Sequence, residues 1–427
     1  MVFLALIIEV TCFYPPGSMA EENKNKVNIK VWAPTAFTSN QAAKKAEKDF
    51  AAQNPDITVT LETFEDPVTG KAKFITAIDA GNAPDVGLCN LWWVKDFAIN
   101  DWIVPLDNLI SKNTIKDYIP HFLEYASYNG KLYGLFEYTD CAVVVYRKDL
   151  FEKAGIPLPD PADPWAQDEF IKIAQQLTKG RIWGLGVNAK NEGPTTYTQF
   201  PFFWMARGEL LDKSGKPSFN GDAAMKTFHL YHDLMYKYKV IPPEAISYGM
   251  ADIQRGFAAG IYAMALVGNW QAHALLNTEG MEDKVGIMTY PVFKKGDNSQ
   301  TIHGGWVYTI LTDNPERQKA AVEYIEYMTS PKVQGAFTKE KGSLPVRVSL
   351  YKNDPYYSQP LQQVYYQALQ TAKAKPGDPV YGLIQNEYTA ALVSFLLDKT
   401  TAQQALNNAD AAVKQKAKEQ GIWEWGD

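Results

Sequence analysis

Cysteine, histidine and long apolar runs are scarce in this chain of 427 residues. Its three cysteines are too few for a disulfide-stabilised scaffold. Neither they nor the five histidines follow a metal-ligand spacing such as C-x-x-C or H-x-x-x-H. We therefore predict no metal site, and whether Cys89 pairs with Cys141 is left open. Beyond residue 20 the sequence has no apolar run of the ~20 residues that a membrane-spanning helix needs.

Clustered positive charge and the common enzyme motifs are also missing. The 42 basic and 48 acidic residues give a net charge of −6 without a basic block, so we predict no binding to nucleic acid. The sequence has no nucleophile elbow, P-loop or glycine-rich dinucleotide turn in the right context, so we predict no catalytic residue and no cofactor. A pair of catalytic carboxylates stays open, because their separation depends on the fold.

Aromatic side chains are abundant, at 13% of residues, and add both core area and flat surfaces for stacking ligands. The length allows two or three domains of ~150 residues each. Residues 1–20 are set apart from the fold, since they hold a short apolar run without Lys or Arg and small residues typical of a cleavage site at Ser18-Met19-Ala20. We interpret this segment as a signal peptide or as a vector-derived remnant. Cys12 lacks the neighbours typical of a lipid-attachment site.

The order of elements after residue 26 predicts an α/β fold. Ala43, Ala46 and Phe50 repeat at helical spacing behind a predicted N-cap at Ser39, and a second helix surrounds Phe74. Alternating and β-branched patterns predict strands before, between and after these helices, at 26–32, 57–61 and 83–88. Such alternation is typical of a parallel sheet, and open sheets of this kind bind ligands at the carboxyl ends of their strands.

A polar joint at Phe136–Asp140 lies between two apolar segments. It follows a predicted turn at Asn129-Gly130, and a strand buried on both faces follows it at Cys141–Tyr146. Asp149 is predicted to cap the next helix. On spacing alone, the joint is either an ordinary loop within one sheet or a connection between two parts of the fold.

A second glycine-rich stretch, Gly256–Trp270, predicts a helix ending at Gly260 and a buried strand at Ile261–Val267. We expect Gly268-Asn269-Trp270 to open a loop, where the glycine lets the backbone approach a ligand and the indole offers a flat face. The alternative is that Trp270 is a core residue.

Five motifs from this chain resemble the extracellular solute-binding proteins of ABC importers, family 1, the sugar-binding group that includes the maltose-binding protein. They are AGNAPDV at 80–86, VPLD at 104–107, GKLYG with VYRKDLFEKAGI at 130–156, GFAAGIYAMALVGNW at 256–270 and GSLPVR at 342–347. The resemblance implies a two-lobed, periplasmic-binding-protein-like α/β fold of type II topology, with a ligand cleft between the lobes and a hinge. It implies one lobe from 21–138 and 291–330, and a second lobe from 139–290 and 331–427.

The resemblance further implies a binding protein that captures a sugar or oligosaccharide by lobe closure and delivers it to permease subunits. Such a protein is expected to be a monomer, exported to the periplasm or the outer face of the cell membrane, with lipid anchoring left open. Two alternatives remain, a carbohydrate-active enzyme using the same aromatic cleft and a binder of another solute such as a polyamine or a sugar phosphate.

Eleven residues are predicted to contact the ligand. Indoles would stack on sugar rings, although one of the adjacent Trp92-Trp93 pair is expected in the core. Carboxylates would accept bonds from sugar hydroxyls, with solvated loop carboxylates as the alternative, and Arg347 would either donate to the sugar or fix the hinge. The complete set is Trp270, Trp306, Trp93, Trp92, Asp140, Glu137, Glu65, Asn90, Asn269, Gly305 and Arg347. His303 is interpreted as a structural histidine.

Overall fold

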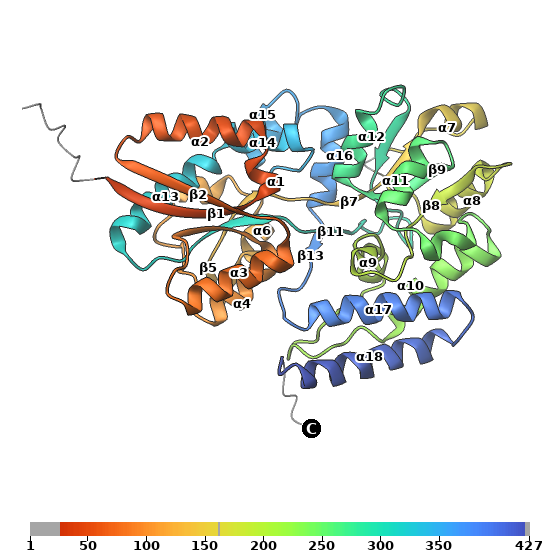
Figure 1. Cartoon of the computed structure of the whole chain (residues 1–427). Helices are drawn as coiled ribbons and strands as arrows, with labels where there is room; N and C mark the ends of the chain where they lie inside the picture. Colours follow the sequence, from red (N-terminus) through yellow and green to blue (C-terminus); the bar gives the residue numbers. More distant parts are fainter. Residues whose placement is uncertain (1–25, 161–162, 423–427) are drawn as a thin grey trace, which may run out of the picture.

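Two mixed β-sheets, one in each of two lobes, organise the chain, as the computed structural model shows for residues 26–160 and 163–422 (Figure 1). The predicted segment 1–20, with Cys12, lies outside the described residues. Among the helices in those two ranges, none is both long enough and apolar enough to cross a bilayer. Cys89 and Cys141 are both buried and free.

The first sheet has the strand order β2-β1-β3-β12-β6. β1 runs parallel to β2 and β3, as predicted, because helical crossovers connect these strands. β12 arrives from far along the sequence and runs antiparallel to β3 and β6, so the sheet is mixed rather than parallel. The strands are β1 (Val27–Pro34), β2 (Ile57–Phe64), β3 (Val86–Asn90), β6 (Leu135–Tyr138) and β12 (Trp306–Ile310).

Helices cover both faces of this sheet. α2 buries Ala43, Ala46 and Phe50 as predicted, but its N-cap is Asn40, whose side chain accepts from Ala43 N at 3.0 Å. The predicted cap at Ser39 is wrong because that residue ends the preceding turn in a helical conformation. The helices are α1 (Thr35–Thr38), α2 (Gln41–Gln53), α3 (Pro67–Asp79), α4 (Val94–Ile99), α5 (Lys112–Lys116), α6 (Pro120–Tyr125), α13 (Pro315–Met328), α14 (Pro331–Lys341) and α15 (Val348–Asn353).

The predicted turn at Asn129-Gly130 is confirmed, since it joins the antiparallel pair β4 (Ser127–Tyr128) and β5 (Lys131–Leu132). Both turn residues have positive φ, 48° and 74°. That conformation is the one that a two-residue hairpin of type I′ needs, and asparagine and glycine adopt it most readily.

The second sheet has the strand order β10-β7-β9-β8. Its strands are β7 (Ala142–Arg147), β8 (Trp183–Gly186), β9 (Tyr262–Gly268) and β10 (Val285–Met288). Its helices are α7 (Lys148–Ala154), α8 (Gln167–Leu177), α9 (Thr196–Met205), α10 (Asp222–His232), α11 (Met250–Ala258), α12 (Asn269–Leu276), α17 (Tyr381–Leu396) and α18 (Ala402–Glu419). α17 and α18 pack together against α10 at one side of this lobe (Figure 1).

Two local predictions in this lobe are wrong. Asp149 lies inside the first turn of α7 and pairs with Arg147 at 2.6 Å instead of capping the helix. The expected loop at residues 268–270 is the start of α12, whose third residue, Gln271, accepts from Gly268 N at 3.2 Å. A Cβ on Gly268 would lie 2.4 Å from the indole of Trp270, so this glycine makes room for the tryptophan ring.

Within the described residues, three connections join the lobes. The first is the short segment between β6 and β7, at 139–141. The second follows β10, stays with the second lobe through Val292, whose N–H donates to Trp165 O at 2.8 Å, and reaches β12 through Gly304-Gly305. The third leaves α16 (Pro360–Leu369) and enters α17 through β13 (Ala372–Ala374), which pairs in parallel with β11 (Thr301–His303). The chain thus changes lobe only after Val292.

The lobe boundaries stay a prediction. They are 21–138 with 291–330 for the first lobe and 139–290 with 331–427 for the second. α14, within the second predicted lobe, contacts α2 and β6 of the first sheet. We propose on this basis that the segment from Pro331 to about residue 350 moves with the first lobe.

Asn269 ties the first connection to the segment after α14. Its side chain is 1% exposed, its Oδ1 accepts from Cys141 N at 2.9 Å, and its Nδ2 donates to Gly342 O at 2.7 Å. A ligand-contacting role was predicted for Asn269, but both of its functional atoms are occupied by backbone.

We predict that Asn269→Ala lowers the free energy of unfolding by about 2–5 kcal/mol, because it leaves a buried N–H and a buried C=O without partners. Urea unfolding followed by circular dichroism measures this. Asn408→Ala, an exposed asparagine on α18, is the control and should change the value by less than about 0.5 kcal/mol. Equal stability of the two variants would contradict the role assigned to Asn269.

Candidate functional site

A cavity of about 300 Å³ lies between the lobes, over the connections that join them. Each lobe contributes one wall and the connections contribute the floor. The first lobe supplies Pro67, Asn90, Leu91 and Trp92; the second supplies Pro194, Tyr197, Met250, Trp270 and Gln385; the floor holds Asp140, His303, Gly304, Gly305 and Lys375. Of the predicted ligand residues, the cavity brings together Asn90, Trp92, Asp140, Trp270 and Gly305.

Two tryptophans face this cavity from opposite lobes. Trp270, in the first turn of α12, is 39% exposed, and its ring lies 5.1 Å from that of Tyr197 at an angle of 59°. Trp92 is half-buried in the short 3-10 helix after β3, with Lys71 Nζ 5.1 Å from its ring. Exposed indoles in a cavity offer flat apolar faces for a ligand.

Asp140 is the carboxylate of the floor. Its Oδ1 accepts from the Tyr197 hydroxyl at 2.6 Å and from Gly304 N at 2.9 Å. Burial raises the pKa of Asp140 above its ordinary value, and the two hydrogen bonds oppose that rise. The described residues supply no hydrogen bond to Oδ2, so this oxygen remains an acceptor for a donor within the cavity.

Two floor residues were not predicted to bind a ligand. His303 is fully buried, its Nδ1 donates to Gly304 O at 3.1 Å, and its Nε2 has no hydrogen-bond partner among the described residues. Burial lowers the pKa of His303 to about 3, so the ring is neutral. Lys375 is half-buried; burial lowers its pKa, and Asp140 opposes that change. The Lys-Pro-Gly sequence around Lys375 indicates only a turn.

Four of the predicted ligand residues are buried away from the cavity. Trp93 is 0% exposed and packs among Phe64, Phe74 and Phe97, so it is the core member of the Trp92-Trp93 pair. The other three are Glu137, Asn269 and Arg347.

Arg347 serves as a structural anchor. Its guanidinium donates to Thr329 O at 2.7 and 3.0 Å and to Thr114 O at 2.8 Å, and it lies 3.8 Å from Asp117. Of the two roles considered for this residue, the contacts favour the anchor. Because these donors are occupied by backbone, Arg347 has little capacity left for a ligand.

Three of the predicted ligand residues that do not line the cavity differ in their surroundings; they are Glu137, Glu65 and Trp306. Burial holds the pKa of Glu137 well above its usual range, and neither of its oxygens has a hydrogen-bond partner among the described residues. Glu65 is exposed and accepts from Thr35 Oγ1 at 3.0 Å. Trp306 is half-buried against Phe64.

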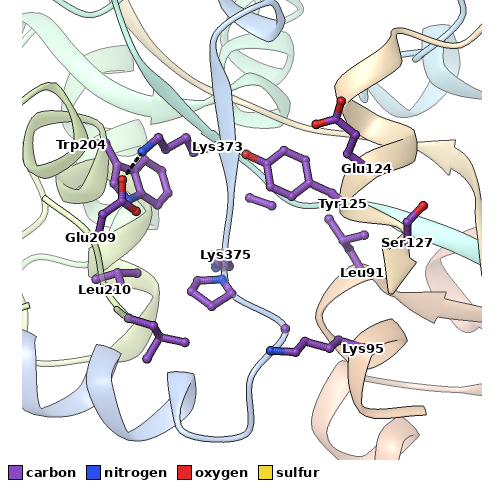
Figure 2. Close-up of a pocket in the computed structure, with 14 residues that line it drawn as sticks. Leu91, Lys95, Glu124, Tyr125, Ser127, Trp204, Glu209, Leu210, Lys373 and Lys375 are labelled. Carbon is purple, nitrogen blue, oxygen red and sulfur yellow. Dashed lines mark hydrogen bonds and ion pairs between the residues drawn. The ribbon is translucent and has the colours of Figure 1, made fainter. Parts of the chain in front are cut away.

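A second cavity, of about 390 Å³, lies along the third connection (Figure 2). Tyr125 and Lys95 of the first lobe face Trp204 and Glu209 of the second across it. Two of its three cations are already paired, Lys373 with Glu209 at 2.8 Å and Lys95 with Asp378 at 3.4 Å. The third, Lys375, lines both this cavity and the first. We take the first cavity as the candidate site because its aromatic faces and polar atoms are still available.

No group of three or more potential metal ligands gathers anywhere in residues 26–160 and 163–422. The site therefore offers stacking and hydrogen bonding as its means of holding a ligand. A sugar needs both, since its rings have apolar faces and its hydroxyls have donors and acceptors.

Comparison with known proteins finds relatives in the family that the sequence motifs resemble. The family model of bacterial extracellular solute-binding proteins matches residues 36–335. A protein of Brucella abortus, named only as a binding protein, is 26% identical over 368 residues, covering 86% of this chain and 88% of the relative.

Two solved structures share the predicted two-lobed α/β fold, which is thereby confirmed. One is an ABC transporter solute-binding protein of Thermotoga lettingae bound to α-D-tagatose, with a TM-score of 0.73, 27% identity and coverage of 91% of this chain and 99% of that one. The other is a sugar-binding protein of Xanthomonas citri, with a TM-score of 0.81, 24% identity and coverage of 94% and 100%.

The buried, neutral His303 generates a prediction on pH. Its pKa of about 3 in the fold lies below the ordinary 6.5, so between these values the unfolded chain binds a proton that the folded chain does not. His303 therefore leaves the free energy of unfolding unchanged above about pH 6.5. As the pH falls below 6.5, protonation of this histidine in the unfolded chain lowers the free energy of unfolding, by at most about 5 kcal/mol.

We expect His303→Asn, which keeps a donor near the position of Nδ1, to be less stable at pH 7 but to lose less stability than the wild type between pH 6.5 and 4. Urea unfolding at a series of pH values measures this difference. The control is His229→Asn, which changes an exposed histidine and should keep the wild-type slope. A wild-type slope in His303→Asn would refute the argument.

Proposed function

The chain belongs to the bacterial extracellular solute-binding proteins, and from that premise we propose that it is the substrate-binding component of an ABC importer for a carbohydrate. The observation that supports a carbohydrate most directly is the pair of indoles, Trp92 and Trp270, that face one cavity from opposite lobes. Such faces suit the apolar side of a sugar ring, and the Asp140 carboxylate below them suits its hydroxyls.

The same geometry supports lobe closure as part of this proposal. The walls belong to different lobes, and the floor consists of the connections, so rotation about the connections would change the distance between Trp92 and Trp270 while Asp140 stays in place. The closed form would be the one presented to the permease. We propose further that the protein acts outside the cytoplasmic membrane as a monomer, and that it binds its solute without making or breaking a bond.

The T. lettingae relative was solved with tagatose, which supports a small sugar as the first class to test. We expect at least one sugar from a panel of tagatose, glucose, maltose, maltotriose and arabinose to raise the melting temperature. A ligand at a hundred times its Kd adds about 2.7 kcal/mol to the free energy of unfolding. Chromatography of the recovered sugar should show it unchanged. Cleaved sugar would indicate an enzyme, and a shift with spermidine or glucose 6-phosphate alone would indicate another solute class.

We predict that Trp270→Ala weakens binding of the best sugar of that panel by roughly tenfold to a hundredfold, the equivalent of about 1–3 kcal/mol. The melting temperature without sugar should hardly change, because the indole is 39% exposed. Isothermal titration calorimetry and a thermal melt measure the two quantities.

Trp183→Ala is the matched control, since it removes a half-buried indole outside the cavity and should keep the wild-type affinity. A melt that collapses in Trp270→Ala, or an affinity equal to that of the wild type, would mean that Trp270 serves packing.

A further inference from the structure

Lys375 lies at the floor of the candidate site, and the proposed function gives it no role. It follows β13 on the third connection, and its side chain lines the same cavity as Asp140 and Trp270. Its ammonium lies 5.3 Å from the ring centre of Tyr197, the residue whose hydroxyl donates to Asp140. Lys375 and Asp140 thus approach the same tyrosine from two different connections.

The ammonium of Lys375 donates to no acceptor in the part of the chain that the structure describes. Within residues 26–160 and 163–422, no carboxylate lies within 4 Å of its Nζ, and no oxygen accepts a hydrogen bond from it. Lys373, two residues earlier, differs in this respect because it reaches Glu209, as Figure 2 shows. A half-buried ammonium that donates to none of the described residues favours a ligand that brings an acceptor oxygen.

Asp140 offers the complementary atom. Its Oδ1 receives two donors from the protein, whereas its Oδ2 receives none from the described residues. The floor therefore presents one acceptor and one set of donors. A neutral polyol satisfies both, since each hydroxyl can donate to a carboxylate and accept from an ammonium. An ammonium group beside Lys375 offers it no acceptor and is repelled by it, and an acidic group beside Asp140 is repelled in the same way.

We propose that Lys375 is a specificity-determining residue of this site, which donates to an oxygen of a neutral sugar and excludes positively charged solutes such as amino sugars. The proposal rests on the proposed carbohydrate function and adds to it which sugars the site accepts. On this proposal, the third connection contacts the ligand directly through Lys375.

The test compares Lys375→Met with Lys373→Met, a change of the same residue type on the same connection. The probe is the neutral sugar of the panel above that binds the wild type best, measured by calorimetry. We expect Lys375→Met to weaken binding by about tenfold to a hundredfold, as for the loss of a hydrogen bond from a charged donor, while Lys373→Met stays within about threefold. The melt without sugar verifies that both variants are folded.

Selectivity provides a readout that a merely structural role would not change. Glucosamine is added as a competitor of the neutral sugar, and we expect it to compete better, relative to that sugar, in Lys375→Met than in the wild type. Lys375→Arg keeps the charge and should keep the exclusion. Glucosamine that competes equally in all three proteins, or in none of them, overturns the exclusion.

The possible failures are distinguishable. If sugar binds the wild type and Lys375→Met alike, or if Lys373→Met loses as much affinity, the role of Lys375 is refuted while the carbohydrate function stands. If no sugar of the panel binds the wild type, the carbohydrate function is refuted and the role of Lys375 with it.

Discussion

The hydrogen bonds between the first and second connections are the constraint on which the site depends. Gly304 N donates to Asp140 Oδ1 at 2.9 Å, and Thr139 Oγ1 donates to Gly304 O at 3.0 Å. On its other side, Thr139 exchanges backbone bonds of 2.8 and 2.9 Å with Leu344. Polar backbone at the junction of two lobes must be satisfied somewhere, and here its partners are the second connection and the segment after α14. The floor of the cavity is thereby held while the walls belong to separate bodies.

Glycine is required where these segments meet. Gly305 has a φ of +123°, and a Cβ there would lie 2.5 Å from Tyr138 O. The sequence suggested Gly305 as a ligand contact, and it does line the cavity, but the backbone geometry alone explains its identity. Any larger residue would push the second connection away from the first and so displace the floor of the site.

The sequence was most informative where apolar residues repeat with the period of a strand or a helix. Alternation along residues 26–32 and the helical spacing of Ala43, Ala46 and Phe50 predicted the first strand and its helix, and the motifs predicted the family that residues 36–335 match. Asn90, Trp92 and Trp270 line the cavity, and the sequence drew attention to them because each lies at or just beyond the end of a strand. Lys375 gave no such signal, since its position follows from β13 pairing with β11, a contact between segments far apart in the sequence. Ser39 and Asn40 are both capping residues, and only the preceding turn decides between them.

Glu137 and Asp140 show why residue type could not identify the polar floor. Both carboxyls belong to one joint, three positions apart, and both were predicted to accept from a sugar. Glu137 is on β6 and 0% exposed, and neither of its oxygens has a hydrogen-bond partner among the described residues. Burial raises the pKa of Glu137 well above its usual range, and the charge of Arg347 only opposes that rise. Asp140 lies beyond the end of β6, where Tyr197 and Gly304 donate to it and the cavity reaches it. Since a carboxylate accepts well from hydroxyls only where other donors support its charge, the two acids differ in their capacity to accept from a ligand because of the partners that the fold supplies.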